Sequence, residues 1–161
     1  MGQVNISVKV NGQEYQADVD TRMLLVELLR EKLNLTGTHV GCLTGNCGVC
    51  TVIMDDVTVK SCTILAAQAN GAEVTTIEGL SKGLELNYIQ QAFSRNFAAQ
   101  CGFCTPGMII TAHFLLSKNS DLNLEEIKQA LTGNLCRCTG YQHILKAILE
   151  AAKASKAGVG T

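Results

Sequence analysis

The sequence predicts an α+β protein in which a β-rich N-terminal half is followed by an all-helical C-terminal half. Two observations lead to this prediction. Up to about residue 78, apolar residues mostly alternate with polar ones, as in half-buried strands. Beyond that point they recur every three or four residues, as on the buried face of a helix. The length of 161 residues fits two small domains.

The N-terminal half contains the signals of two hairpins, one helix and a last strand. Alternating segments flank Asn11-Gly12, a dipeptide typical of a two-residue hairpin turn. Thr21 is a candidate cap for a leucine-rich helix that ends near Gly37. Further strands are expected at 51–54, 57–59 and 74–77, the first two joined by a turn at Asp55-Asp56. Residues 1–78 are therefore predicted to form a domain of β-grasp type with one helix.

Residues 79–161 are predicted to form a four-helix domain, after a linker at residues 78–83. The first helix is expected at 89–97. The second begins at Thr105-Pro106, because proline suits the first turn of a helix. The third begins at Leu124 and stops near residue 133, and the fourth opens at Thr139-Gly140.

Composition excludes several classes of function. The formal net charge is -1 and aromatic residues make up 4% of the chain, so nucleic-acid binding is not expected. No apolar run approaches the roughly 18 residues of a membrane-spanning helix, so direct membrane insertion is not expected either. The N-terminus alternates instead of presenting the apolar core of a signal peptide, which favours a cytoplasmic location.

The eight cysteines are the most informative feature of the composition. They form two sets of four, with the spacings C-x4-C-x2-C-x11-C and C-x2-C-x31-C-x1-C. A disulfide framework is typical of short secreted chains that lack a core, and structural zinc favours paired C-x2-C motifs. Both fit less well than iron–sulfur binding, because C-x4-C-x2-C with a distant fourth cysteine is the plant-type [2Fe–2S] spacing. The first set comprises Cys42, Cys47, Cys50 and Cys62, and the second Cys101, Cys104, Cys136 and Cys138.

Glycines in the first cysteine loop support this interpretation. Three thiolates of one short loop have to converge on a small anionic cluster, and the backbone has to turn N–H groups toward the sulfurs. Glycine permits the positive φ values that such a loop requires. Four glycines lie between residues 37 and 48: Gly37, Gly41, Gly45 and Gly48.

Two further motifs carry a family resemblance. The segments QCGFCTPGM, beginning at Gln100, and GNLCRCTGY, beginning at Gly133, follow the plant-type loop. Together they resemble the iron–sulfur subunit of the molybdenum hydroxylases, the xanthine dehydrogenase and aldehyde oxidase superfamily, over residues 4–152. The chain is most similar to the small subunits of bacterial three-chain enzymes, which include aerobic carbon monoxide dehydrogenase and the N-heterocycle and nicotine hydroxylases.

The resemblance implies a ferredoxin-like first domain, a helical second domain and a role for each cysteine. Cys42, Cys47, Cys50 and Cys62 match the ligands of one [2Fe–2S] cluster, and Cys101, Cys104, Cys136 and Cys138 those of a second. Gln100 and Cys138 match residues at the edge of the molybdopterin. Without the resemblance, the favoured interpretation of Gln100 is a loop amide that bonds its own backbone.

The resemblance also implies partners. Electrons would pass from molybdopterin, of cytosine dinucleotide type, in a large subunit through both clusters to FAD in a medium subunit. The expected assembly is a dimer of heterotrimers. The enzyme would hydroxylate an N-heterocyclic or aldehyde substrate with water, or oxidise carbon monoxide. Two other functions stay open: a free-standing ferredoxin-like carrier and a zinc-binding or assembly module.

Overall fold

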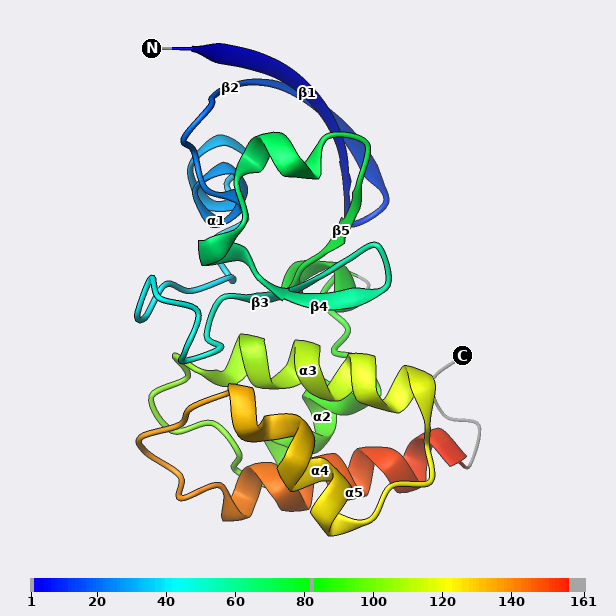
Figure 1. Ribbon diagram of the computed structural model, residues 1–161. Helices are drawn as coiled ribbons and strands as arrows, with labels where there is room; N and C mark the ends of the chain where they lie inside the picture. Colours follow the sequence, from blue (N-terminus) through cyan, green and yellow to red (C-terminus); the bar gives the residue numbers. More distant parts are fainter. Residues whose placement is uncertain (1, 82, 157–161) are drawn as a thin grey trace.

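The computed structural model describes residues 2–81 and 83–156 and contains a β half and a helical half (Figure 1). The predicted order of a β-rich segment followed by helices is confirmed. Within the described residues, no helix is both long and apolar enough to cross a membrane.

The β half is built on a mixed five-stranded sheet. Its strands are β1 (Gln3–Val10), β2 (Gln13–Asp20), β3 (Thr51–Met54), β4 (Val57–Lys60) and β5 (Glu73–Thr75), in the spatial order β2-β1-β5-β3-β4. β1 and β5 are parallel, whereas the other neighbours are antiparallel. Both predicted hairpins are present. Their turns have positive φ at Asn11 and Gly12 and at Asp55 and Asp56, the pattern that matches the twist of paired strands.

The predicted start of the first helix was wrong. The helix begins at Leu25 rather than beside Thr21, as α1 (Leu25–Glu27), and continues as a π-helical segment (Leu28–Lys32). The backbone N–H of Thr21 bonds Gly2, and the Glu27 carboxylate accepts from the N–H of Leu24 at 2.7 Å. Glu27 therefore performs the capping that the sequence assigned to Thr21. The leucines of this helix fill a core with the inward residues of the sheet: Ile6, Val8, Val10, Val19, Leu25, Leu28, Leu29, Val52 and Val74.

The helical half contains the four expected helices, α2 (Tyr88–Arg95), α3 (Thr105–Lys118), α4 (Leu124–Ala130) and α5 (Gln142–Lys156). α5 begins later than expected, because Thr139, Gly140 and Tyr141 still belong to the preceding loop. The four helices enclose a second, separate core: Ile89, Phe93, Met108, Ile109, Leu116, Ile127, Leu131, Ile144 and Ile148. The apolar periodicity of the C-terminal half predicted most of this core. The helix expected at 89–97 ends at Arg95, however, and Phe97, expected on its apolar face, lies beyond the helix and is 77% exposed.

The expected linker is held against the β half over part of its length. β5 ends at Thr75, and Ile77–Leu80 forms a 3-10 helix instead of the end of a strand. The Glu78 carboxylate accepts the N–H of Gly37 at 2.7 Å, which ties this segment to the first cysteine loop. Lys82, within the predicted linker, lies outside the described residues.

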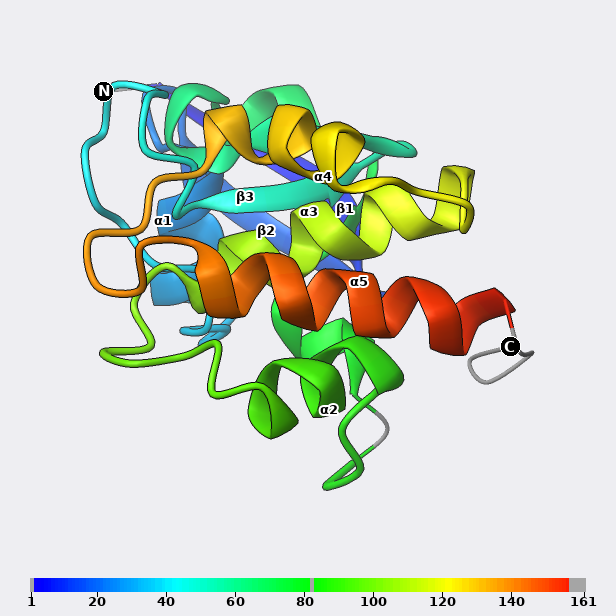
Figure 2. The ribbon, with the colours of Figure 1, turned by 90° about the horizontal axis from the view of Figure 1, so that it is seen from below.

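The two halves meet where α3 lies against β3 and β4 (Figures 1 and 2). Backbone approaches backbone at this junction. A Cβ atom on Gly48 would lie 2.0 Å from the carbonyl oxygen of Gly133, and one on Gly107 would lie 2.4 Å from that of Gly48. The N–H of Leu135 bonds the carbonyl of Cys47 at 2.8 Å. No side chain larger than hydrogen fits at Gly48 or Gly107 unless the two halves move apart.

Buried polar side chains complete this junction. The Asn134 amide donates to the Gly48 carbonyl at 3.0 Å and accepts from the Thr111 hydroxyl at 3.1 Å. Asn134 is 3% exposed, so these bonds satisfy polar atoms that water does not reach.

We expect Gly48→Ala to destabilise the chain far more than Gly71→Ala. Both glycines have positive φ, +70° and +81°, so both variants lose roughly 1–2 kcal/mol to backbone strain. Only Gly48 also faces another backbone, because nothing lies within 4 Å of a Cβ on Gly71. The expected additional loss is about 2 kcal/mol, measured by urea unfolding. Equal losses for the two variants would contradict the close contact of the halves.

Candidate metal centres

The first cysteine set lies on the loop between the helical segment and β3, with its fourth member just after β4. Cys50 and Cys62 are buried, 2% and 4% exposed, and pack beside Val26. Ser61 holds these two segments together, because its hydroxyl donates to the Cys50 carbonyl at 2.7 Å. The Cys50 and Cys62 thiols lie close enough to influence each other's ionisation. Burial, followed by this contact, raises the pKa of Cys50 to about 11.

In the outer part of this loop, backbone N–H groups point toward a sulfur, as expected from the glycines of the loop. The Cys42 sulfur accepts the backbone N–H groups of Thr44 and Cys47, each at 3.4 Å. Hydrogen bonding from Thr44, then from Cys47, lowers the pKa of Cys42 to about 5. Gly45 has positive φ, and so does Leu43, which the sequence did not single out for backbone geometry. Cys42 and Cys47 are both only partly exposed.

The absence of a side chain at Gly41 leaves space beside the Cys47 sulfur. A Cβ at Gly41 would lie 3.0 Å from the Cys47 sulfur, closer than a carbon normally approaches. The glycine therefore leaves the sulfur free on that side.

The second cysteine set comes from two loops of the helical half. Cys101 and Cys104 precede α3, and Cys104 is its N-cap residue. Cys136 and Cys138 lie in the loop before α5. The Cys101 and Cys138 sulfurs are 3.4 Å apart and both residues are exposed. Burial, then contact with Cys136, raises the pKa of Cys104 to about 12.

Hydroxyl groups fix the loop that carries Cys136. The Cys136 sulfur lies 3.1 Å from the Thr139 hydroxyl, and the Cys136 backbone N–H donates to the Tyr141 hydroxyl at 3.0 Å. Burial opposes ionisation of Cys136, but hydrogen bonds from Thr139, Cys138 and Cys104 together outweigh it and lower the pKa of this thiol. The loop thus favours the thiolate, which is the form that binds metal.

The eight sulfurs meet as four pairs: Cys42 with Cys47, Cys50 with Cys62, Cys101 with Cys138, and Cys104 with Cys136. Among the described residues, no group of three or more Cys, His, Asp or Glu side chains could hold one ion. A [2Fe–2S] cluster takes two protein ligands on each of its two irons. Two pairs in each half therefore fit the donor set of one such cluster.

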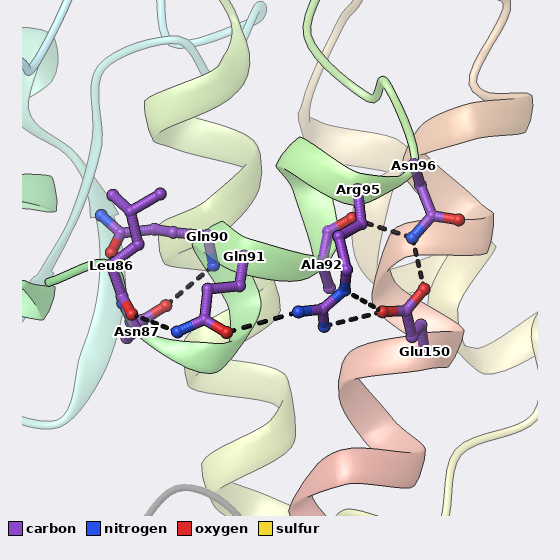
Figure 3. Close-up of polar contacts among 8 residues, drawn as sticks. All are labelled: Leu86, Asn87, Gln90, Gln91, Ala92, Arg95, Asn96 and Glu150. Carbon is purple, nitrogen blue, oxygen red and sulfur yellow. Dashed lines mark hydrogen bonds and ion pairs between the residues drawn. The ribbon is translucent and has the colours of Figure 1, made fainter.

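The second cysteine loop begins at a polar clamp between α2 and α5 (Figure 3). Arg95 and Asn96, where α2 ends, bond opposite oxygens of Glu150 on α5, at 2.8 and 2.6 Å. Asn96 and Arg95 hold the pKa of Glu150 below its ordinary value. His143 bonds the Asn96 carbonyl at 3.0 Å. The clamp fixes the point from which the chain runs to Cys101.

Gln100 lies on the surface next to Cys101. Within the described part of the chain, its side-chain amide forms no hydrogen bond. The amide is therefore available to a group outside this chain.

The histidines take structural positions. His39 stacks on Phe103, with ring centroids 4.8 Å apart, and its Nδ1 lies 2.9 Å from the Phe103 carbonyl oxygen. This contact joins the two cysteine loops across the halves, which no sequence pattern indicated. His113 is half-buried on α3, and burial lowers its pKa.

Comparison with family models defines the class of protein. Residues 8–77 match the model of a 2Fe-2S iron-sulfur cluster binding domain, and residues 76–149 match that of a [2Fe-2S] binding domain. The chain is thus an iron–sulfur protein with two [2Fe–2S] binding modules in series.

Individual relatives define the family more narrowly. The chain is 49% identical to the nicotine 6-hydroxylase small subunit of Paenarthrobacter nicotinovorans, over 92% of this chain and 89% of that protein. It is 47% identical to the caffeine dehydrogenase subunit gamma of Pseudomonas sp. (strain CBB1), over 89% and 87%. A chain of quinoline 2-oxidoreductase from Pseudomonas putida 86 superposes with a TM-score of 0.93 at 44% identity, covering 98% of both chains.

The chain belongs to the iron–sulfur small subunits of the molybdenum hydroxylases, the xanthine dehydrogenase and aldehyde oxidase superfamily. Its function is electron transfer within an oxidoreductase. The family resemblance expected from QCGFCTPGM and GNLCRCTGY is confirmed.

In the folded chain without iron, we expect Cys42 to be the fastest thiol to react with iodoacetamide at pH 7. Its pKa of about 5 keeps it a thiolate, whereas the thiolate fraction of Cys104, with a pKa of about 12, is about 10⁵-fold lower. Peptide mass spectrometry gives both rates. The Cys42 rate should fall by about half at pH 5. A rate at Cys42 that still rises between pH 7 and pH 9 would contradict the hydrogen bonding assigned to it.

Proposed function

We propose that this subunit carries one [2Fe–2S] cluster on Cys42, Cys47, Cys50 and Cys62 and a second on Cys101, Cys104, Cys136 and Cys138. The observation that carries this proposal is the meeting of the eight sulfurs as four pairs, two in each half. When bound, each cluster accepts and releases one electron. We further propose that residues 1–78 and 79–161 are the two cluster-binding domains; the matched models meet at residues 76 and 77.

The two pairs of sulfurs in the helical half differ in exposure, which indicates the pair that would face a partner subunit. Cys101 and Cys138 are exposed, whereas Cys104 and Cys136 are only partly exposed. Gln100 adjoins the exposed pair, and its amide forms no hydrogen bond with any other described residue. An amide offers two donors and an acceptor, which suits the edge of a pterin. Gln100 and Cys138 would therefore face the molybdopterin of a large subunit. The cluster of the helical half would then receive electrons from molybdopterin before the cluster of the β half.

The contact between the halves supplies the connection between the two sites. The backbone from Cys136 to Leu135 reaches the Cys47 carbonyl through a hydrogen bond of 2.8 Å. Only covalent bonds and this hydrogen bond then lie between a ligand of the second cluster and a ligand of the first. We propose that electrons cross between the halves here.

The outer rim of the first cysteine loop is the proposed exit. Leu43 is 56% exposed, and Thr44 and Asn46 are exposed beside it. With no aromatic or charged side chain among these three residues, FAD of a medium subunit could approach the Cys42 and Cys47 pair closely. The proposed assembly is a dimer of heterotrimers whose large subunit holds molybdopterin cytosine dinucleotide.

The proposed substrate of the whole enzyme is a nitrogen heterocycle, hydroxylated with oxygen from water. Nicotine, caffeine and quinoline, which occur in the names of the relatives, are all nitrogen heterocycles. The substrate would bind at molybdenum in another chain. The helical half argues against a free-standing ferredoxin, because its exposed sulfurs would then face water.

We expect the purified subunit to contain about four Fe, as two [2Fe–2S] clusters require. Cys104→Ser removes one member of a sulfur pair in the helical half, so only the second cluster should be lost. EPR should show one cluster signal missing and the other nearly intact, with about two Fe remaining. Zinc in place of iron, or loss of both signals, would contradict the assignment of ligands.

We expect Gln100→Ala to slow reduction of the clusters by substrate while cluster content stays unchanged. The pterin edge would lose a polar partner, which costs roughly 1–3 kcal/mol and lowers molybdenum occupancy. Rapid-mixing absorption spectroscopy of the complex gives the rate.

Gel filtration provides the control for the partners. The wild-type complex should elute well above the 17.2 kDa of this chain. A chain that elutes alone would contradict the large and medium partners. Normal rates with full molybdenum occupancy in Gln100→Ala would contradict the role of residue 100 alone.

A further inference from the structure

Lys60 occupies an unusual position for a lysine. It is the last residue of β4, and its side chain is only partly exposed. Its ammonium donates to the Thr51 hydroxyl at 2.9 Å, and that hydroxyl donates to the Gly48 carbonyl at 2.6 Å. Lysine is rarely buried unless it is paired. Among the described residues, however, no carboxylate forms an ion pair with Lys60.

Strand pairing places Lys60 beside the first cysteine set. Lys60 lies opposite Thr51, which follows Cys50, and two residues before Cys62. Burial lowers the pKa of Lys60, and the charges of Cys50, Cys47 and Cys62 oppose this shift. On its other side, a Cβ at Gly133 would lie 3.6 Å from the Lys60 Nζ. Gly133 leads into the segment that ends at Cys136. The ammonium therefore lies at the junction of the two halves, beside the first set of sulfurs.

This position makes the redox potential of a cluster at the first site sensitive to the positive charge of Lys60. One-electron reduction adds one negative charge to a [2Fe–2S] cluster. A nearby positive charge in a partly dehydrated position is more favourable after that addition than before it. The effect on the second cluster is expected to be smaller. The ammonium bonds Thr51, the residue after Cys50, whereas its neighbour in the helical half is Gly133, three residues before Cys136.

We propose that Lys60 is a positioning residue for electron transfer, whose charge makes the first cluster the favoured resting place of an electron received from the second. In this step the second cluster is oxidised by one electron and the first is reduced by one, with no other reactant. The inference rests on the proposed function, because it requires both clusters to be bound.

A purely structural role for Lys60 makes a different prediction. If the side chain served only to bond Thr51, a neutral glutamine at position 60 could replace it. If its charge matters, Lys60→Gln and Lys60→Met should behave alike, and Lys60→Arg should behave like the wild type. Lys9→Met is the matched control: it removes one positive charge from the same sheet, at β1, where Lys9 pairs with Glu73 at 3.0 Å.

The test is a redox titration of the full chain in the complex with which it purifies, with the two EPR signals followed separately. At the potential where the wild-type first cluster is half reduced, Lys60→Met and Lys60→Gln should lower its reduced-to-oxidised ratio about tenfold. For a one-electron couple this ratio corresponds to about 59 mV. The second cluster should shift clearly less, and Lys60→Arg and Lys9→Met should leave the first unchanged.

Two results would overturn the inference: an unchanged first cluster in both neutral variants, or an equal shift in Lys60→Arg. Iron analysis separates this failure from failure of the proposed function. Wild-type protein with about four Fe and two EPR signals retains the cluster assignment whatever Lys60 does. If Lys60→Met does not fold, Lys60→Gln and Lys60→Arg still distinguish charge from hydrogen bonding.

Discussion

The contact between two stretches of backbone, Cys47-Gly48 in the β half and Gly133 to Leu135 in the helical half, determines most of this structure. Two separate hydrophobic cores lie on either side of it. What joins them is the approach of carbonyl and N–H groups that only glycine permits at Gly48 and Gly107. Asn134 and Thr111 then satisfy the polar atoms that this approach buries. The halves thereby present their cysteine loops to each other at hydrogen-bond distance.

A second constraint is the accumulation of negative charge, since eight thiolates are concentrated in one small chain. Local interactions stabilise the thiolate at some of these cysteines and oppose ionisation at others. Backbone amides stabilise the Cys42 thiolate, and hydrogen bonds from Thr139 stabilise that of Cys136. Desolvation instead raises the pKa values of Cys50, which is buried, and Cys104, which is partly exposed, so that ionisation there depends on a metal. Each half therefore contains at least one sulfur prepared as a thiolate and at least one that metal binding must deprotonate.

The electron path that we propose follows from the same geometry. Exposed sulfurs at Cys101 and Cys138 suit a partner's cofactor, and the internal contact from Leu135 to Cys47 suits transfer within the chain. The clamp of Arg95, Asn96 and Glu150 and the stack of His39 on Phe103 hold the loop between them in place. A loop fixed at both ends keeps its sulfurs preorganised, so that little rearrangement accompanies each electron.

The sequence by itself determined the order of the halves, both hairpins, the four helices, the family and the two sets of cysteines. These features depend on local periodicity, turn chemistry and ligand spacing, which neighbouring residues specify. It failed at the start of the first helix, because the N-cap is Leu24 rather than Thr21, and the Glu27 carboxylate three residues beyond Leu24 accepts its N–H. Only the tertiary structure decided which sulfurs pair, that Gly48 contacts Gly133, and that Lys60 lies beside the first set. These contacts join residues up to 86 positions apart, and long-range packing, which no local pattern encodes, brings them together.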